Sequence, residues 1–126
     1  MKKVRPGLRA TFAAHAITAL VFGLINLFIP DIWGDLVNWP VDDTRAYRLL
    51  GAAMLAFGVS SVLAYLETDW EKVIIIVRTE IVWTALGTLV LLWAIIFDGA
   101  PVIGWLYVVL MGVWTVLFSI FYNPAT

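Results

Sequence analysis

The sequence predicts an all-α integral membrane protein, a four-helix up-and-down bundle with a short amphipathic interfacial helix in its first connection. Two observations are compositional: 63% of the 126 residues are hydrophobic and only 13% are charged. Soluble domains average roughly 45 to 50% apolar and about 25% charged residues, and a chain this small cannot bury so much apolar surface within itself. The third observation is the presence of four apolar stretches near the length of about 20 residues that a membrane-spanning helix needs.

The first span is expected at about residues 10–29, where Pro30 ends the helix. Basic residues precede this stretch, as they precede a secretory signal, but the apolar run is longer than a signal core and lacks a small-residue cleavage site. We therefore expect a retained span. The connection that follows repeats apolar residues at one-turn spacing, opposite acidic ones: Ile32, Trp33, Leu36 and Val37. This pattern is typical of a short helix in the membrane interface.

The other three spans are expected at about residues 46–66, 73–97 and 101–122. Pro101 suits the first turn of the last helix, because its missing N–H has no partner there in any case. The connections between the second, third and fourth spans are short, so these helices should be antiparallel neighbours. The whole chain is then one transmembrane domain, residues 1–126.

The basic residues near the span ends predict the orientation. Lysine and arginine are retained on the cytoplasmic side, and most of them lie near the N-terminus or the connection between the second and third spans. We therefore predict a multi-pass protein of the cell membrane with both termini cytoplasmic. Tryptophans prefer the headgroup level, and five lie near predicted span ends as interfacial anchors: Trp33, Trp39, Trp70, Trp93 and Trp105.

Small side chains at four-residue spacing predict close helix contacts, because helices in lipid associate through packing and not through hydrophobicity. The second span carries Ala52, Ala56, Ser60 and Ala64 at this spacing. The first span carries Ala19 and Gly23 on the stripe that includes His15. The stripe of the second span faces either a neighbour in the same bundle, which we expect, or a partner chain.

His15, the chain's one histidine, should face protein, because its stripe is made of small residues. Three roles are open: an axial ligand of a chlorin, a proton relay, or a histidine that bonds a neighbouring helix. The last is the expected one. We predict no cofactor and no metal site, since a single histidine without cysteine cannot build a multi-ligand centre.

Arg78 and Glu80 lie in the first half of the third span, where an ionised group is costly. Two positions apart, they point to nearly opposite sides of the helix. Arg78 can reach the headgroups along its aliphatic stem, whereas Glu80 is shorter and shares a stripe with Thr84 and either Gly87 or Thr88. Glu80 should therefore face the bundle, and its depth matches that of His15 at about 1.5 Å per residue. We predict a contact between Glu80 and His15.

Asn26 and Arg48 are a second pair of polar residues at matching depth, on the other side of the membrane. One interpretation is a site for an anion or a lipid headgroup. The other is an interfacial arginine that bonds headgroups, Asp98 or local carbonyls.

The segment Arg48, Leu49, Leu50, Gly51 and Ala52 opens a small-residue helix after an outer connection rich in proline and tryptophan. This layout resembles small tetraspan prokaryotic membrane proteins, including the DoxX-like group and related families of unknown function. The resemblance implies a four-helix bundle and assigns no catalytic residue.

The expected function is that of a non-catalytic accessory or assembly subunit of a larger membrane complex, because no nucleophile–base pair, phosphate loop or metal cluster is present. One alternative is a small oligomeric transporter or channel that uses Glu80 and His15. Another is a protein that binds a pigment, a quinone or a lipid. The expected partners are the lipid bilayer and other membrane subunits or further copies of the chain. Nucleic acid is excluded, because eight basic residues against nine acidic ones leave no cationic surface.

Overall fold

The computed structural model describes all 126 residues and has four helices long and apolar enough to cross a membrane. These are α1 (Pro6–Phe28), α3 (Thr44–Leu66), α4 (Trp70–Phe97) and α5 (Ile103–Ile120). The short helix α2 (Pro30–Leu36) lies in the first connection. The predicted fold class is therefore confirmed. The boundaries differ slightly: α1, α3 and α4 begin earlier than expected, and α5 is shorter at both ends.

Capping residues explain where the helices begin. Pro6 starts α1 in the first turn, where proline loses no hydrogen bond. The side chain of Asp43 accepts the N–H of Arg45 at 2.9 Å before α3, and that of Asp69 accepts the N–H of Glu71 at 3.1 Å before α4. Each carboxylate satisfies a backbone donor that the first turn leaves unpaired. Because these caps precede the apolar residues, α3 and α4 begin before the hydrophobic stretch itself.

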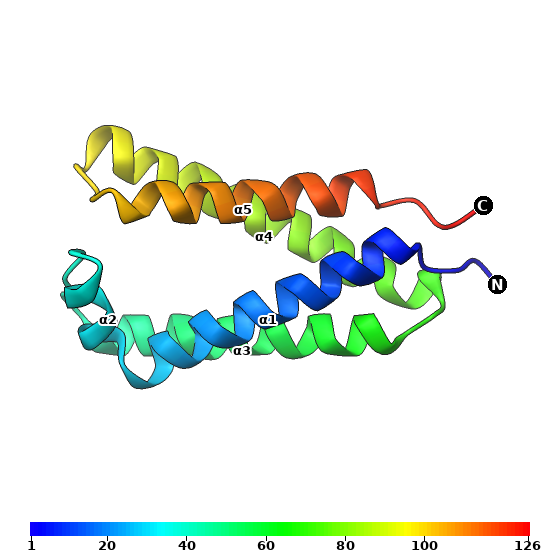
Figure 1. Cartoon of the computed structure of the whole chain (residues 1–126), viewed down its shortest axis with the longest axis horizontal. Helices are drawn as coiled ribbons and strands as arrows, with labels where there is room; N and C mark the ends of the chain where they lie inside the picture. Colours follow the sequence, from blue (N-terminus) through cyan, green and yellow to red (C-terminus); the bar gives the residue numbers. More distant parts are fainter.

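The helices associate as two hairpins. Helix α1 packs along α3, and α4 packs along α5 (Figure 1). Helices α3 and α4 are antiparallel, as expected from their short connection, but they make little contact with each other. The main packing partner of α3 is thus α1, its antiparallel neighbour across the α2 connection.

Both termini lie at the same end of the bundle, and α2 lies at the opposite end (Figure 1). We call the two parts of the bundle the terminal half and the α2 half. The hydrophobic core is in the terminal half and is built by nine buried residues from the N-terminal segment and all four spans: Val4, Leu8, Phe12, Ala64, Val73, Ile74, Val77, Trp114 and Phe118.

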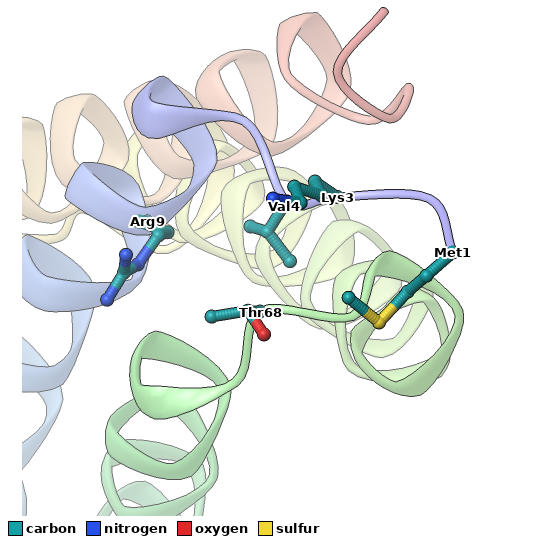
Figure 2. Close-up of a pocket in the computed structure, with 5 residues that line it drawn as sticks. All are labelled: Met1, Lys3, Val4, Arg9 and Thr68. Atoms are coloured by element: carbon teal, nitrogen blue, oxygen red, sulfur yellow. The ribbon is translucent and has the colours of Figure 1, made fainter.

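Backbone hydrogen bonds tie the two hairpins together at the terminal end. The N–H of Val4 donates to the carbonyl of Thr68 at 3.1 Å, and the N–H of Trp70 donates to the carbonyl of Lys2 at 2.8 Å. The N–H of Ala125 donates to the carbonyl of Lys3 at 2.9 Å. A surface cavity of about 280 Å³ lies where the N-terminal segment meets the α3–α4 connection; it is lined by Met1, Lys3, Val4, Arg9 and Thr68 (Figure 2).

Glycines bring α1 and α3 into close contact. A Cβ atom on Gly51 would lie 2.5 Å from the backbone nitrogen of Leu27, and one on Gly23 would lie 3.0 Å from the backbone nitrogen of Leu55. Both distances are too short for a side chain, so the two backbones approach as only glycine allows. Gly23 and Ala19 are buried, as predicted for the first span.

The contact face of α3 differs from the predicted one. Gly51, Gly58, Ser61 and Ala64 are buried, whereas Ala52 and Ala56 are exposed and Ser60 is only half-buried. As an intrachain contact, the prediction is right for Ala64 and wrong for Ala52 and Ala56. The reason is that glycine permits a closer approach than alanine, so α3 turns its glycines and not its alanines towards α1.

Aromatic contacts hold α2 against α5 in the α2 half. The indole N–H of Trp33 donates to the hydroxyl of Tyr107 at 2.9 Å, and the rings of Phe22 and Trp39 pack against the same tyrosine. Trp70 also has a protein partner, since its N–H donates to the carbonyl of Tyr122 at 2.8 Å. Trp93 and Trp105 are exposed near the ends of their helices. Three of the five predicted anchors are therefore partly engaged in packing within the protein.

Candidate functional site

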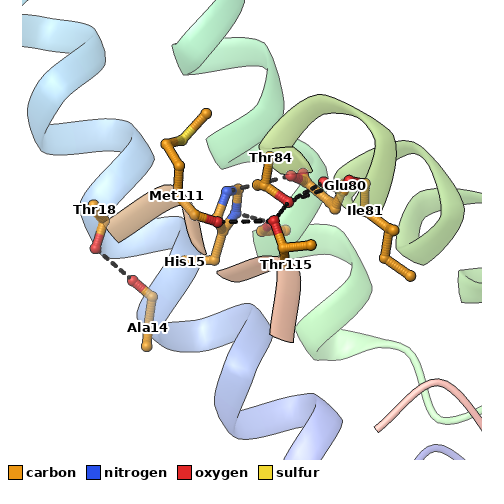
Figure 3. A network of polar contacts seen from close by, with 9 residues as sticks. Ala14, His15, Thr18, Glu80, Ile81, Thr84, Met111 and Thr115 are labelled. Atoms are coloured by element: carbon orange, nitrogen blue, oxygen red, sulfur yellow. Dashed lines mark hydrogen bonds and ion pairs between the residues drawn. The ribbon is translucent and has the colours of Figure 1, made fainter. Parts of the chain in front are cut away.

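His15 and Glu80 meet inside the bundle, as the sequence predicts. The Nε2 atom of His15 lies 3.3 Å from Oε2 of Glu80 (Figure 3). Helix α1 supplies the histidine and α4 the glutamate, so the contact joins the two hairpins. The exposed fraction is 4% for His15 and 0% for Glu80. The two ionisable groups therefore share one site that is closed to both lipid and bulk water.

The imidazole of His15 is held on three sides. Its Nδ1 atom lies 2.8 Å from Oγ of Ser61 on α3, which is itself fully buried. The rings of Trp114 and Phe118 on α5 contact the imidazole edge-on, with centroids 5.4 and 5.5 Å away. These contacts leave Nε2 as the nitrogen that faces Glu80.

The carboxylate of Glu80 has no hydrogen-bond partner on either oxygen. The Nε2 atom of His15 is near, but its 3.3 Å contact with Oε2 is a close approach that does not meet hydrogen-bond geometry. A buried polar group without a partner costs several kcal/mol, about 1 to 3 even by protein mutational estimates. Glu80 is thus the most costly side chain in the bundle.

Hydroxyl groups line the site next to Glu80. The hydroxyl of Thr84 donates to the backbone carbonyl of Glu80 at 2.7 Å, and the hydroxyl of Thr115 on α5 lies 2.8 Å from that of Thr84 (Figure 3). Thr88 continues the row one turn further along α4 and donates to the carbonyl of Thr84 at 2.7 Å. Thr84 and Thr88 belong to the stripe predicted from the sequence. Sequence reasoning missed Ser61 and Thr115, because isolated hydroxyls in apolar helices carry no signal of which face they occupy.

This arrangement can hold one proton in two ways. With the proton on Glu80, the neutral carboxyl faces the lone pair of Nε2, and Nδ1–H donates to Ser61. With the proton on Nε2, the carboxylate faces the N–H of an imidazolium ring, and Nδ1–H still donates to Ser61. The two states differ by transfer of a single proton over 3.3 Å. The site therefore has the chemistry of a proton-binding pair.

The contacts of His15 also test whether it could be the axial ligand of a chlorin. A chlorin or haem would need one ring nitrogen to face a space as large as a macrocycle. Nδ1 faces Ser61, Nε2 faces Glu80, and two aromatic rings flank the imidazole. The residues present do not fit a macrocycle at this position.

Arg78 lies apart from the pair. It is exposed, its Nε atom donates to the hydroxyl of Tyr122 at 2.9 Å, and its guanidinium lies 6.0 Å from the centre of that ring. Arg78 and Glu80 thus occupy different sides of α4, as their spacing predicts. The arginine reaches towards the terminal end and contributes no charge to the buried site.

Asn26 and Arg48 are not brought together. The amide of Asn26 donates to the carbonyl of Phe22 on its own helix at 2.9 Å and lies 3.8 Å from the sulfur of Met54. Arg48 is exposed at the start of α3. Equal depth did not produce a contact, because α1 and α3 meet through their glycines and the arginine is on another face. The anion-site interpretation gains no support from this geometry.

No protein-family model matches the chain, and comparison with curated proteins and with solved structures finds no similar protein. The layout-level resemblance to DoxX-like tetraspan proteins therefore stays a prediction.

Proposed function

We propose that this protein is a small, non-catalytic membrane transporter or channel that binds and releases a proton at the His15–Glu80 pair. The observation that carries this proposal is the Glu80 side chain, which is fully buried beside His15 and has no hydrogen-bond partner. Ionisable residues inside membrane helices are expensive, and they typically mark ion pathways and proton relays. A stable fold alone needs no such group.

The surroundings of the pair support a proton as the bound species. The site contains one carboxylate, one imidazole and several hydroxyls, and no second acid lies against it. A His–Glu pair can accept or lose a proton while its hydroxyl neighbours adjust their donor and acceptor roles. The exposed apolar residues on every span are suited to lipid and to further copies of the chain, so we expect an oligomer.

We also propose the orientation of the protein in the membrane. The terminal end carries Lys2, Lys3, Arg5 and Arg9 in the N-terminal segment, and Lys72 at the start of α4 lies at the same end. By the distribution of basic residues, this end faces the cytoplasm. The α2 end then faces the outside.

Proton flux into liposomes tests the proposed function. The protein is reconstituted into vesicles that contain a pH-sensitive dye, and a potassium diffusion potential drives proton entry. We expect flux above that of empty vesicles, and at least a tenfold loss in Glu80→Gln and in His15→Gln. Glu71→Gln is the matched control, because it makes the same chemical change at an exposed position on α4. Equal flux in Glu80→Gln and wild type, or none in wild type, would refute the proposal.

A second candidate is an accessory or assembly subunit of a larger membrane complex, favoured by the exposed positions of Ala52 and Ala56 on α3. Small residues on a lipid-facing surface allow another helix to approach closely. Ala56→Leu should then abolish co-migration with partner subunits in mild detergent and leave the isolated fold intact. Val59→Leu, at an exposed position that is already large, is the control. If Ala56→Leu co-migrates like the wild type, this candidate fails.

A further inference from the structure

We propose that the His15–Glu80 pair exchanges its proton with the α2 side of the membrane and is sealed from the terminal side. This inference rests on the proposed role of the pair as a proton site and adds the route to it. The evidence is an asymmetry in what surrounds the pair: an apolar plug on one side and a row of hydroxyls on the other.

The plug lies between the pair and the terminal end. On α1 it contains Leu8 and Phe12, which precede His15, and on α4 it contains Val73 and Val77, which precede Glu80. On α5, which runs in the opposite direction, Phe118 lies on the terminal side of Trp114. Leu8, Phe12, Val77 and Phe118 are each 0% exposed. Thr11 is the one buried polar side chain on this side of the pair, and its hydroxyl donates to the carbonyl of Gly7 on its own helix at 2.8 Å. The rest of the plug is apolar and closely packed, so it offers no second polar group to carry a proton through.

The terminal end is also tied shut by the backbone. Residues 2–4 bond to the α3–α4 connection and to the C-terminal segment through the carbonyls of Lys2 and Lys3 and the N–H of Val4. These bonds hold the two hairpins together on this side. The surface cavity beside Arg9 and Thr68 lies at the outer edge of the plug (Figure 2).

The opposite side of the pair is polar. Thr84 follows Glu80 by one turn and is 0% exposed, Thr88 follows by another turn, and Thr115 faces Thr84 from α5. Each hydroxyl donates to a backbone carbonyl of its own helix, and its oxygen can still accept a hydrogen bond, so the row is a suitable polar lining for a proton path. Thr84 and Thr88 follow Glu80 along α4 towards the α2 end, and Thr115 is placed beside them by its contact with Thr84.

Towards the α2 end, the large side chains that cross between the hairpins are only half-buried, among them the stacked rings of Phe57 and Trp83, whose centroids are 5.3 Å apart. The hairpins diverge towards the α2 end (Figure 1). The buried residues of this half are small or belong to α2 itself: Ala19, Gly23, Gly51, Gly58, Gly104, Pro30 and Gly34. Between the pair and the α2 end, the spans carry few ionisable groups, namely Tyr107 on α5 and Arg45, Tyr47 and Arg48 at the start of α3. None of these groups lies next to Glu80 along the chain, so none of them blocks the path that the threonines line.

Cysteine accessibility tests the direction, and the natural absence of cysteine means that no background labelling needs removal. Single variants Thr84→Cys, Thr88→Cys and Val77→Cys are placed in sealed vesicles and treated with a small, impermeant, cationic methanethiosulfonate from either side. Asp98→Cys reports access to the α2 end and Lys72→Cys reports access to the terminal end. Val77→Cys is the matched control, because it lies about as far from Glu80 as Thr84 does but on the plugged side.

We expect Thr84→Cys and Thr88→Cys to react only from the side that labels Asp98→Cys, at least tenfold faster than Val77→Cys reacts from either side. Thr115→Cys, on the facing helix, gives the same test if a variant on α4 fails to fold. Reaction from the side that labels Lys72→Cys would overturn the inference. So would cysteines at positions 84, 88 and 115 that react in denaturant but never in the membrane.

Labelling does not depend on flux, so the two proposals can fail separately. Access from the α2 side without any proton flux would leave the route standing and refute the transport function. Flux that depends on Glu80, together with access from the terminal side, would retain the function and refute this route.

Discussion

The terminal half and the α2 half of the bundle are held together in different ways. In the terminal half, large side chains from all four spans interlock in a core that contains Phe12 and Phe118. In the α2 half, each hairpin is packed mainly within itself, and α2 links them through the hydrogen bond from Trp33 to Tyr107. Lipid is as apolar as a leucine side chain, so hydrophobicity does not require large buried residues anywhere in a membrane bundle. Their concentration on one side of the His15–Glu80 pair is the observation behind the seal proposed above.

The largest expected effect comes from removing a ring of the plug. Phe12→Ala opens a cavity where the side chain is 0% exposed. It should lower the free energy of unfolding by on the order of 2 to 3 kcal/mol. This is less than the roughly 3 to 5 kcal/mol seen in soluble cores, because in a membrane the substitution loses side-chain packing but no transfer of the ring out of water. Phe28→Ala, at a position 67% exposed in the α2 half, should change it by about 0.5 kcal/mol or less. Unfolding monitored in mild detergent measures both, and equal losses would contradict the contrast between the two halves.

The glycine contact between α1 and α3 should be nearly as sensitive. Gly51→Ala places a Cβ against the backbone of Leu27 and should cost about 1 to 3 kcal/mol. Gly112→Ala has nothing within 4 Å of the new Cβ and should stabilise α5 by up to about 1 kcal/mol through helix propensity. The same unfolding assay should therefore give opposite signs for the two substitutions. A loss at both positions would mean that Gly112 also lies against a partner helix.

Glu80 itself should contribute nothing favourable to folding. Glu80→Leu removes two unpaired oxygens from the interior and should leave the protein as stable as wild type or more stable by about 1 kcal/mol. Proton flux should be lost in the same variant. A gain in stability with a loss of flux would show that Glu80 serves function, whereas the apolar plug beside it serves stability. Clear destabilisation by Glu80→Leu would instead assign the carboxylate a structural role through His15, and a double-mutant cycle with His15→Leu would measure that coupling.

The link between α2 and α5 should have a smaller effect. Tyr107→Phe removes the acceptor for the Trp33 N–H and should cost about 0.6 kcal/mol, typical of a hydrogen bond between membrane helices. Tyr65→Phe is the control, because it makes the same chemical change at an exposed position at the terminal end of α3. Faster labelling of Thr88→Cys in the Tyr107→Phe background would show that α2 limits access from its side. An unchanged rate would leave α2 outside the path.

The smallest effect is expected from pH at the α3–α4 connection. The Glu67 side chain accepts the backbone N–H groups of Asp69 and Thr68, and these hydrogen bonds lower the pKa of Glu67. A lowered folded-state pKa stabilises the protein above the ordinary glutamate value, and this contribution is lost as the pH falls through the lowered pKa. Wild type should therefore lose slightly more thermal stability than Glu67→Gln between roughly pH 5 and pH 3. Identical pH profiles for the two proteins would contradict this.

Much of the candidate site could be predicted because depth follows directly from helix geometry. His15 and Glu80 lie at similar heights on their spans, and each belongs to a stripe of small or polar residues, so a contact between them was expected. Depth alone was not sufficient for Asn26 and Arg48, which lie at matching heights on different faces. The contact face of α3 was misassigned for a related reason: Gly51 and Ala52 are adjacent, and either could start a small-residue stripe.

By itself, the sequence determined the four spans, the short helix in the first connection, and the presence of a costly carboxylate among apolar residues. These features depend on local composition and on the fixed rise of a helix. Only the tertiary structure decided which face of α3 meets α1, that Ser61 and Thr115 join the polar site, and that the large side chains gather on one side of the pair. These features depend on how helices rotate and tilt against one another, and in lipid that choice is set by the fit of side chains and not by hydrophobicity.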